Sequence, residues 1–181
     1  EFDSMADLVS FGVAPAIVMM YAVMQIASIE KYSSEFWALS ISVSAFVLAG
    51  ALRLARYNIT NEKPIKGWFS GLPITGAGAG LTATAIILIV RYQDQLNTDQ
   101  LTLLVPGFMF FLSLCMVSTF KFPKMAKRDG IYINSFQALN FIVSCYCAVT
   151  KSYPEFLFFM GIFLLITGTV AGFFVRTTQT E

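Results

Sequence analysis

The sequence contains no histidine and few charged residues. Asp, Glu, Lys and Arg make up 13% of its 181 residues, against about 25% in typical globular proteins. The missing histidine excludes the commonest zinc ligand and the usual general base. The net charge of +1 provides no basic surface for nucleic acid, so we expect no such partner. Cys115, Cys145 and Cys147 lie in apolar stretches without ligand partners, which argues against a disulfide framework or a zinc site.

Apolar residues are abundant instead. They make up 56% of the chain, and the mean hydropathy is +0.68, so the composition is that of a membrane protein. At about 20 residues per span, the length allows about six transmembrane helices and almost nothing outside the bilayer. The predicted fold is therefore all-α, a polytopic membrane helix bundle that forms a single membrane-embedded domain over residues 1–181.

Six apolar segments are separated by charged residues, Pro or Asn. They are Leu8–Ile29, Phe36–Leu54, Leu72–Val90, Leu101–Phe120, Phe136–Val149 and Phe156–Val175. The fifth is short and carries Gln137, Asn140 and Ser144, so we expect protein rather than lipid to shield it. Pro15 is expected to kink the first span. The spacing of Gly76 and Gly80, and of Gly168 and Gly172, predicts close approach of helix backbones.

Basic residues between the spans predict the orientation, because Lys and Arg are retained on the cytoplasmic side. Nine of them follow the second, fourth and sixth segments, and three follow the others. The nine are Arg53, Arg56, Lys63, Lys66, Lys121, Lys124, Lys127, Arg128 and Arg176, and the three are Lys31, Arg91 and Lys151. The joints that carry these nine basic residues are expected at the cytoplasmic face of the cell membrane. The segment Glu1–Asp7 is expected on the same side.

Asp3 and Asp7 form the first candidate site. Four residues apart on a helix, they lie one turn apart on the same face, where like charges repel. Acidic residues at a helix N-terminus can simply cap the helix and interact with its macrodipole. Alternatively, the two carboxylates bind a hard divalent cation, which takes oxygen ligands and is often shared with substrate phosphates.

A second cluster, Arg53, Arg56 and Asn58, ends the second span at the same face. The two arginines share one side of a helix, where their guanidiniums can bind phosphate or carboxylate oxygens. The alternative is that both arginines anchor the span by reaching the lipid headgroups. Gly71-Leu72-Pro73 and the segment from Met116 to Lys124 can likewise line a site or serve only as helix boundaries and lipid contacts.

These motifs resemble a known family. The segment from Glu1 to Ala16 is similar to the second half of the CDP-alcohol phosphatidyltransferase signature, D-x2-D-G-x2-A-R-x8-G-x3-D-x3-D. Phe11-Gly-Val-Ala-Pro15, Leu52 to Asn58, Gly71-Leu72-Pro73 and the Met116 to Pro123 segment resemble its phosphatidylserine synthase branch in particular. The first half of the signature is absent, so the resemblance implies that about two helices precede this chain in a protein of about eight spans. The 181-residue chain alone is then expected to be inactive.

The resemblance also implies a reaction. The hydroxyl of L-serine displaces CMP from CDP-diacylglycerol, giving phosphatidylserine, with Mg2+ or Mn2+ as cofactor. Asp3 is implied as a metal ligand, Asp7 as a metal ligand or the general base, and Arg53, Arg56 and Asn58 as candidates that hold phosphate or the serine carboxylate. Membrane lipids are expected partners and a homodimer is a candidate assembly. The alternatives are a sister enzyme that uses glycerol phosphate or inositol phosphate, a small transporter subunit, and a non-catalytic scaffold.

Overall fold

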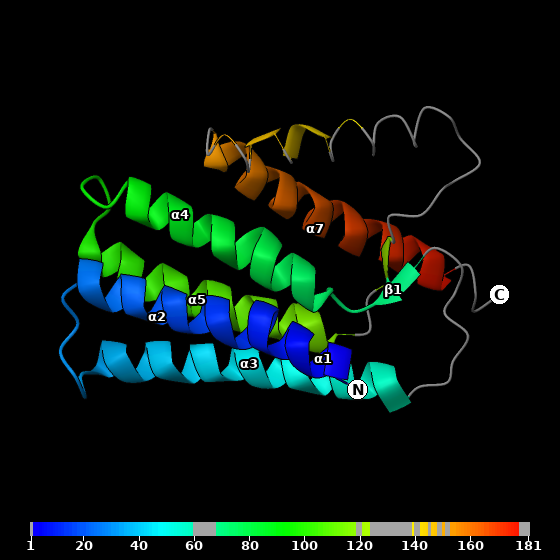
Figure 1. The fold of residues 1–181 in the computed structure, drawn as a ribbon, viewed down its shortest axis with the longest axis horizontal. Coiled ribbons are helices and arrows are strands. Elements are labelled where there is room, and N and C mark those ends of the chain that lie inside the picture. Colours follow the sequence, from blue (N-terminus) through cyan, green and yellow to red (C-terminus); the bar gives the residue numbers. More distant parts are fainter. Residues whose placement is uncertain are drawn as a thin grey trace.

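The protein is a bundle of helices that lie side by side along its long axis (Figure 1). The computed structural model describes residues 2–59, 68–118, 121–123, 139, 142–144, 146–147, 150 and 153–177. The elements in chain order are α1 (Phe2–Asp7), the π-helix η1 (Leu8–Val13), α2 (Ala14–Ile26), α3 (Ser34–Ile59), β1 (Trp68–Ser70), the π-helix η2 (Gly76–Thr82), α4 (Ala83–Arg91), α5 (Thr98–Val117), β2 (Lys121–Pro123) and α7 (Pro154–Thr177). The predicted all-α membrane bundle is confirmed.

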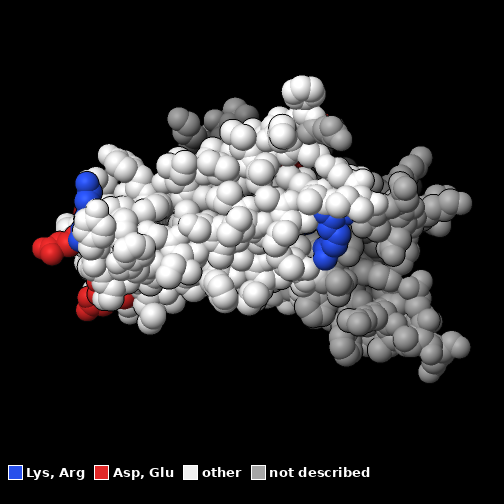
Figure 2. Space-filling model, turned by 90° about the horizontal axis from the view of Figure 1, so that it is seen from below, with Lys and Arg blue, Asp and Glu red and all other residues white. Residues whose placement is uncertain are grey.

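Among the described residues, three helices are long and apolar enough to cross a membrane. They span Phe2–Ile26, Ser34–Ile59 and Thr98–Val117, with 25, 26 and 20 residues, against about 20 needed for the hydrocarbon core. Gly76–Arg91 and Pro154–Thr167 are shorter apolar helices. On the flank drawn in Figure 2, the charged side chains of the described residues gather mainly toward its two ends. Most of the expected span 136–149 lies outside the described residues.

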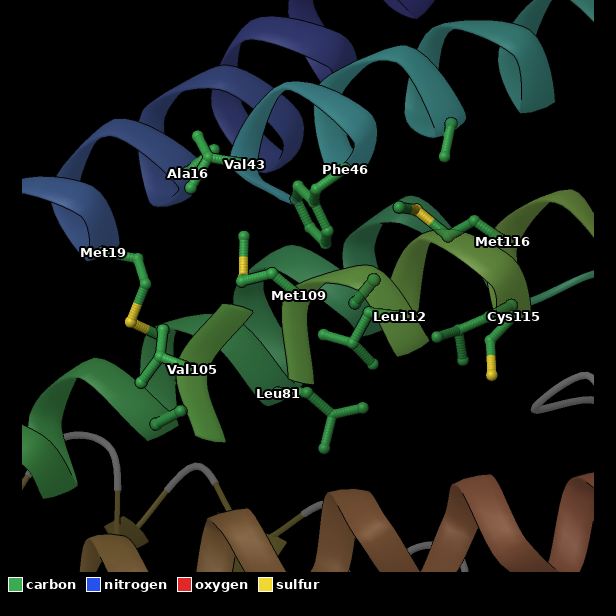
Figure 3. Close-up of a cluster of buried hydrophobic side chains, with 14 of the residues drawn as sticks. Ala16, Met19, Val43, Phe46, Leu81, Val105, Met109, Leu112, Cys115 and Met116 are labelled. Carbon is green, nitrogen blue, oxygen red and sulfur yellow. The ribbon is translucent and has the colours of Figure 1, made fainter. Parts of the chain in front are cut away.

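The core lies mainly between α3 and α5. Phe46 of α3 points toward Met109 and Met116 of α5, and Met19 of α2 reaches Val105 (Figure 3). Phe46, Met109 and Met116 are completely buried. Because lipid tails are as apolar as these side chains, close packing rather than water exclusion holds such helices together.

Two π-helices interrupt the first and third spans. Pro15 has no N–H to donate to the Phe11 carbonyl, and η1 lies directly before it, where the Ala14 N–H donates to Val9 O five residues earlier. In η2 the chain makes the same bond from the Ala83 N–H to Gly78 O. The kink expected at Pro15 thus takes the form of a π-helical turn. The two π-helices, η1 and η2, contact each other.

Of the glycines whose surroundings the structure describes, Gly78 lies closest to the backbone of another helix. A Cβ there would overlap the Phe11 carbonyl oxygen of η1, whereas a Cβ on Gly80 would have nothing within 4 Å. A Cβ on Gly76 would meet only Leu72 and Pro73 of its own segment. The prediction of close approach at Gly76 and Gly80 was therefore wrong.

The surroundings of the second glycine pair, Gly168 and Gly172, lie outside the described residues. Both belong to α7 (Pro154–Thr177). The close approach predicted from their spacing therefore stays a prediction.

A short antiparallel ladder lies at the end of the bundle that also holds α1 (Figure 1). Trp68 pairs with Pro123, and Ser70 pairs with Lys121. The sequence patterns did not predict these strands, because each has only three residues. They fix the segment before the third span relative to the segment after the fourth, and β2 also contacts α7.

At the opposite end of the bundle, a tyrosine links the end of α4 to the start of α7. The Tyr92 hydroxyl, after α4, donates a hydrogen bond to Glu155 in the first turn of α7. Arg91 Nε lies 3.9 Å from the same carboxylate oxygen. The hydrogen bond to Glu155 raises the pKa of Tyr92. This contact joins the end of α4 to the start of α7.

Candidate active site

All five predicted site residues lie toward one end of the bundle. Asp3 and Asp7 belong to α1, and Arg53, Arg56 and Asn58 belong to the last turns of α3. The N-terminus lies beside that end of α3 (Figure 1). Helix α3 continues to Ile59, five residues beyond the span expected from hydropathy, so all three α3 residues are helical.

The two aspartates are accessible. Asp3 is exposed and Asp7 is half-buried. Within the described residues, neither carboxylate forms a salt bridge, and no group of three or more His, Cys, Asp or Glu side chains is gathered. Two carboxylates one turn apart fit a hard cation such as Mg2+, which is usually bound through one or two carboxylates together with substrate phosphates.

Arg53 is a buried cation with incomplete hydrogen bonding. Its exposed fraction is 8%, and its buried Nε atom has no hydrogen-bond partner among the described residues. The charges of Arg56 and Asp7 both act on its guanidinium. A buried guanidinium is stable only when an anion or acceptor compensates for its lost hydration. Arg53 is therefore suited to an anionic group that arrives beside Asp7.

Arg56 is differently placed, although it is only three residues further along the same helix. Its Nη1 donates to the Val117 carbonyl at 3.0 Å, and its Nη2 donates to the Ser118 carbonyl at 3.3 Å. These carbonyls end α5, where helix carbonyls lack intrahelical partners and the macrodipole favours a positive charge. Arg56 thus holds the ends of α3 and α5 together, and its role toward substrate stays a prediction.

Gly71 completes the contact between Arg56 and α5. Its φ of 77° lies in the left-handed region that favours glycine. A Cβ there would lie 2.6 Å from Met116 O and 3.1 Å from Arg56 Nη2. The next residue, Leu72, donates its N–H to Cys115 O at 3.2 Å. The Gly71-Leu72-Pro73 segment therefore packs on the end of α5, and it lies directly before the helix that begins at Ile74, as expected of a helix boundary. Its role in lining a site stays a prediction.

Asn58 forms hydrogen bonds with a residue of α1. Its Nδ2 donates to Ser4 Oγ at 3.1 Å, and Ser4 Oγ donates to Asn58 Oδ1 at 3.3 Å. Sequence reasoning did not single out Ser4. The signal was present, because Ser4 stands between the two aspartates of the motif, but a serine in a helix has many ordinary explanations.

Curated proteins that resemble the chain have serine in their names. A CDP-diacylglycerol–serine O-phosphatidyltransferase of Methanocaldococcus jannaschii is 32% identical over 170 residues, which are 94% of this chain and 68% of that protein. The chain belongs to the CDP-diacylglycerol–serine O-phosphatidyltransferase family. A protein of the same name from Helicobacter pylori is 37% identical over 129 residues, 70% of this chain and 49% of its own length. An archaetidylserine synthase of Methanothermobacter thermautotrophicus is 31% identical over 132 residues, 72% of this chain and 46% of its own length.

No family model matches the chain. The chain also spans only about half the length of the Helicobacter pylori CDP-diacylglycerol–serine O-phosphatidyltransferase. The resemblance seen in the motifs is confirmed at the level of the family. The individual roles of the acidic and basic site residues stay predictions.

Proposed function

We propose that this chain forms part of a membrane enzyme that transfers a phosphatidyl group from CDP-diacylglycerol to L-serine, giving phosphatidylserine and CMP. The observation that carries the proposal is that the α1 aspartates lie at the same end of the bundle as buried Arg53, where the charge of Asp7 acts on that guanidinium. Relatives named as CDP-diacylglycerol–serine O-phosphatidyltransferases and archaetidylserine synthase support serine as the acceptor, because their names share it.

The two aspartates supply the oxygen ligands for Mg2+ or Mn2+. When bound, the cation neutralises the pyrophosphate and stabilises the leaving CMP. Asp7 is half-buried, whereas Asp3 is exposed, and the charge of Asp7 acts on Arg53, so Asp7 is also the better placed of the two to take the proton of the serine hydroxyl. The serine oxygen forms a bond to the phosphatidyl phosphorus, the bond from that phosphorus to CMP breaks, and the proton passes to the carboxylate.

Arg53 binds the serine carboxylate in this proposal. Within the part of the chain that the structure describes, its Nε has no hydrogen-bond partner, so the buried guanidinium has a donor available for a ligand. Charge-assisted bonds to a carboxylate are stronger than neutral ones. Arg56 contributes by holding α3 against α5. Its positive charge also lies close enough to act on Arg53, so both arginines favour an anion at this place.

The site faces the cytoplasm in this proposal, and the protein resides in the cell membrane. The excess of Lys and Arg at the joints after the even-numbered segments supports that orientation. The lipid substrate reaches the site from the surrounding bilayer. A homodimer is the assembly we propose for the complete protein.

The proposal is tested with the complete natural protein in an assay of CMP release. CDP-diacylglycerol is supplied with serine, glycerol phosphate or inositol phosphate, with and without Mg2+ or Mn2+. We expect release with serine and a metal ion, and loss of at least about 99% of it in Asp7→Asn, because the substitution removes a charge needed for metal binding or proton transfer.

Asp94→Asn serves as the matched control, since Asp94 is exposed in the turn between α4 and α5 at the other end of the bundle. It should keep normal activity. Turnover retained by Asp7→Asn would refute the catalytic role, and release with inositol phosphate or glycerol phosphate in place of serine would identify a sister enzyme.

A further inference from the structure

The hydrogen-bonded pair of Ser4 and Asn58 lies between the two halves of the site. We propose that this pair is a positioning device that sets the α1 aspartates against α3, rather than a place where substrate binds. The inference rests on the proposed function, and it gives Asn58 a different role from the substrate contact expected from sequence.

Helix α1 is the first part of the continuous helix Phe2–Ile26, so its backbone is held by its continuation into η1. It has six residues, none of them buried, so side-chain packing does not fix its orientation. Among the described residues, the Ser4–Asn58 contact is the side-chain hydrogen bond that joins α1 to another helix. It links positions 54 residues apart in the chain. Loss of either partner would leave α1 attached mainly through its continuation into η1.

Asn58 is itself held in place. It lies two residues after Arg56, whose guanidinium donates to the Val117 and Ser118 carbonyls at the end of α5. The last turn of α3 is thereby fixed to a second helix. A continuous set of contacts therefore runs from α5 through Arg56 and Asn58 to Ser4, which stands between the two aspartates.

The aspartates need such positioning. Two carboxylates one turn apart repel each other, and a divalent ion requires its oxygen ligands at defined distances. Groups behind the ligands that fix their orientation raise metal affinity. The Ser4 hydroxyl and the Asn58 amide carry no charge, so they can fix the backbone of α1 without competing for the metal ion.

The test compares Ser4→Ala, Asn58→Ala and the double variant in the complete natural protein. Three quantities are measured: Mn2+ binding by electron paramagnetic resonance without substrates, amide hydrogen exchange of α1 in metal-free protein, and the serine KM. A lost hydrogen bond of this kind changes an equilibrium by about threefold to tenfold. Each single variant should weaken Mn2+ binding and speed exchange in α1 by such a factor, and the serine KM should stay unchanged.

The double variant should be no worse than the poorer single variant, because both substitutions break one contact. Ser4→Thr, which keeps a hydroxyl, should restore most of the Mn2+ affinity. Ser44→Ala, at an exposed serine on α3, should change neither Mn2+ binding nor α1 exchange. Exchange in the remainder of α3 shows whether a variant has kept its fold.

Additive losses in the double variant, unchanged Mn2+ binding and α1 exchange in both single variants, or a rise in serine KM confined to Asn58→Ala would each overturn the inference. A natural protein that binds no Mn2+ and releases no CMP would overturn the proposed function as well. A natural protein that releases CMP normally while the variants behave like it would overturn the positioning role alone.

Discussion

Arg53 and Arg56 lie one turn apart on α3, but their guanidiniums have different surroundings. Arg56 donates hydrogen bonds through Nη1 and Nη2 to the carbonyls that end α5. Arg53 is buried, and none of the described residues accepts a hydrogen bond from its Nε atom. Since a buried donor without an acceptor is unfavourable, Arg53 gains more from a bound anion than Arg56 does.

Separate substitutions should divide these roles. Arg53→Gln is expected to raise the serine KM by about tenfold or more, because a charge-assisted bond contributes about 1.5–3 kcal/mol. Arg56→Gln is expected to lower the free energy of unfolding by about 1–2 kcal/mol, because the α5 carbonyls lose a charged donor. Thermal unfolding in detergent and serine titrations distinguish the two. The opposite pattern, with the larger KM effect at position 56, would contradict the assignment.

Sequence reasoning identified both arginines but not this difference between them. The carbonyls that Arg56 contacts are 61 and 62 residues away in the chain, and no local pattern reports such a pairing. Ser4 was overlooked for the same reason, because its partner Asn58 is 54 residues away. Charge and spacing predict which side chains gather at a face, whereas long-range contacts decide which of them remain available to a ligand.

At the scale of elements, η1 and η2 show where periodicity misleads. A spacing of four places glycines on one face only when the hydrogen bonds run four residues back. In η2 the Ala83 N–H reaches five residues back to Gly78 O, so Gly76 and Gly80 do not present one continuous face. Gly78, between them, lies against the Phe11 carbonyl instead. Pro15 indicated a disturbance in the first span, but not its π-helical form.

Two alanine substitutions in η2 test this packing. Gly78→Ala should destabilise the protein by about 3 kcal/mol or more, because the new methyl group would overlap the Phe11 carbonyl and force two spans apart. Gly80→Ala, with nothing within 4 Å of its Cβ, should be neutral or stabilising by up to about 1 kcal/mol. The midpoints of thermal unfolding in detergent provide the comparison. Equal effects at both positions would show that η1 and η2 do not approach as described.

The whole molecule separates apolar flanks from polar ends. The helices present lipid-compatible side chains along their length, and the charged side chains of the described residues gather mainly toward the two ends of the flank in Figure 2. Helix α1, the end of α3 and the β1–β2 ladder share one end (Figure 1). Hydropathy was sufficient to predict this layout, because the bilayer imposes the length and composition of each span. The β1–β2 ladder was missed, since strands of three residues leave no readable pattern. Charge counts then predict which end faces the cytoplasm.

Cysteine labelling on intact cells tests that orientation for the entire bundle. In the complete protein, with Cys115, Cys145 and Cys147 replaced by serine, single cysteines are introduced as Tyr57→Cys and Asp94→Cys. Both positions are exposed, and they lie at the end of α3 and in the turn after α4, respectively. A membrane-impermeant maleimide should label position 94 on intact cells and position 57 only after permeabilisation, because Lys and Arg concentrate at the joints on the side of position 57. Labelling of position 57 on intact cells, with position 94 protected, would place the aspartates of α1 outside the cytoplasm and would contradict a reaction that draws on cytoplasmic serine.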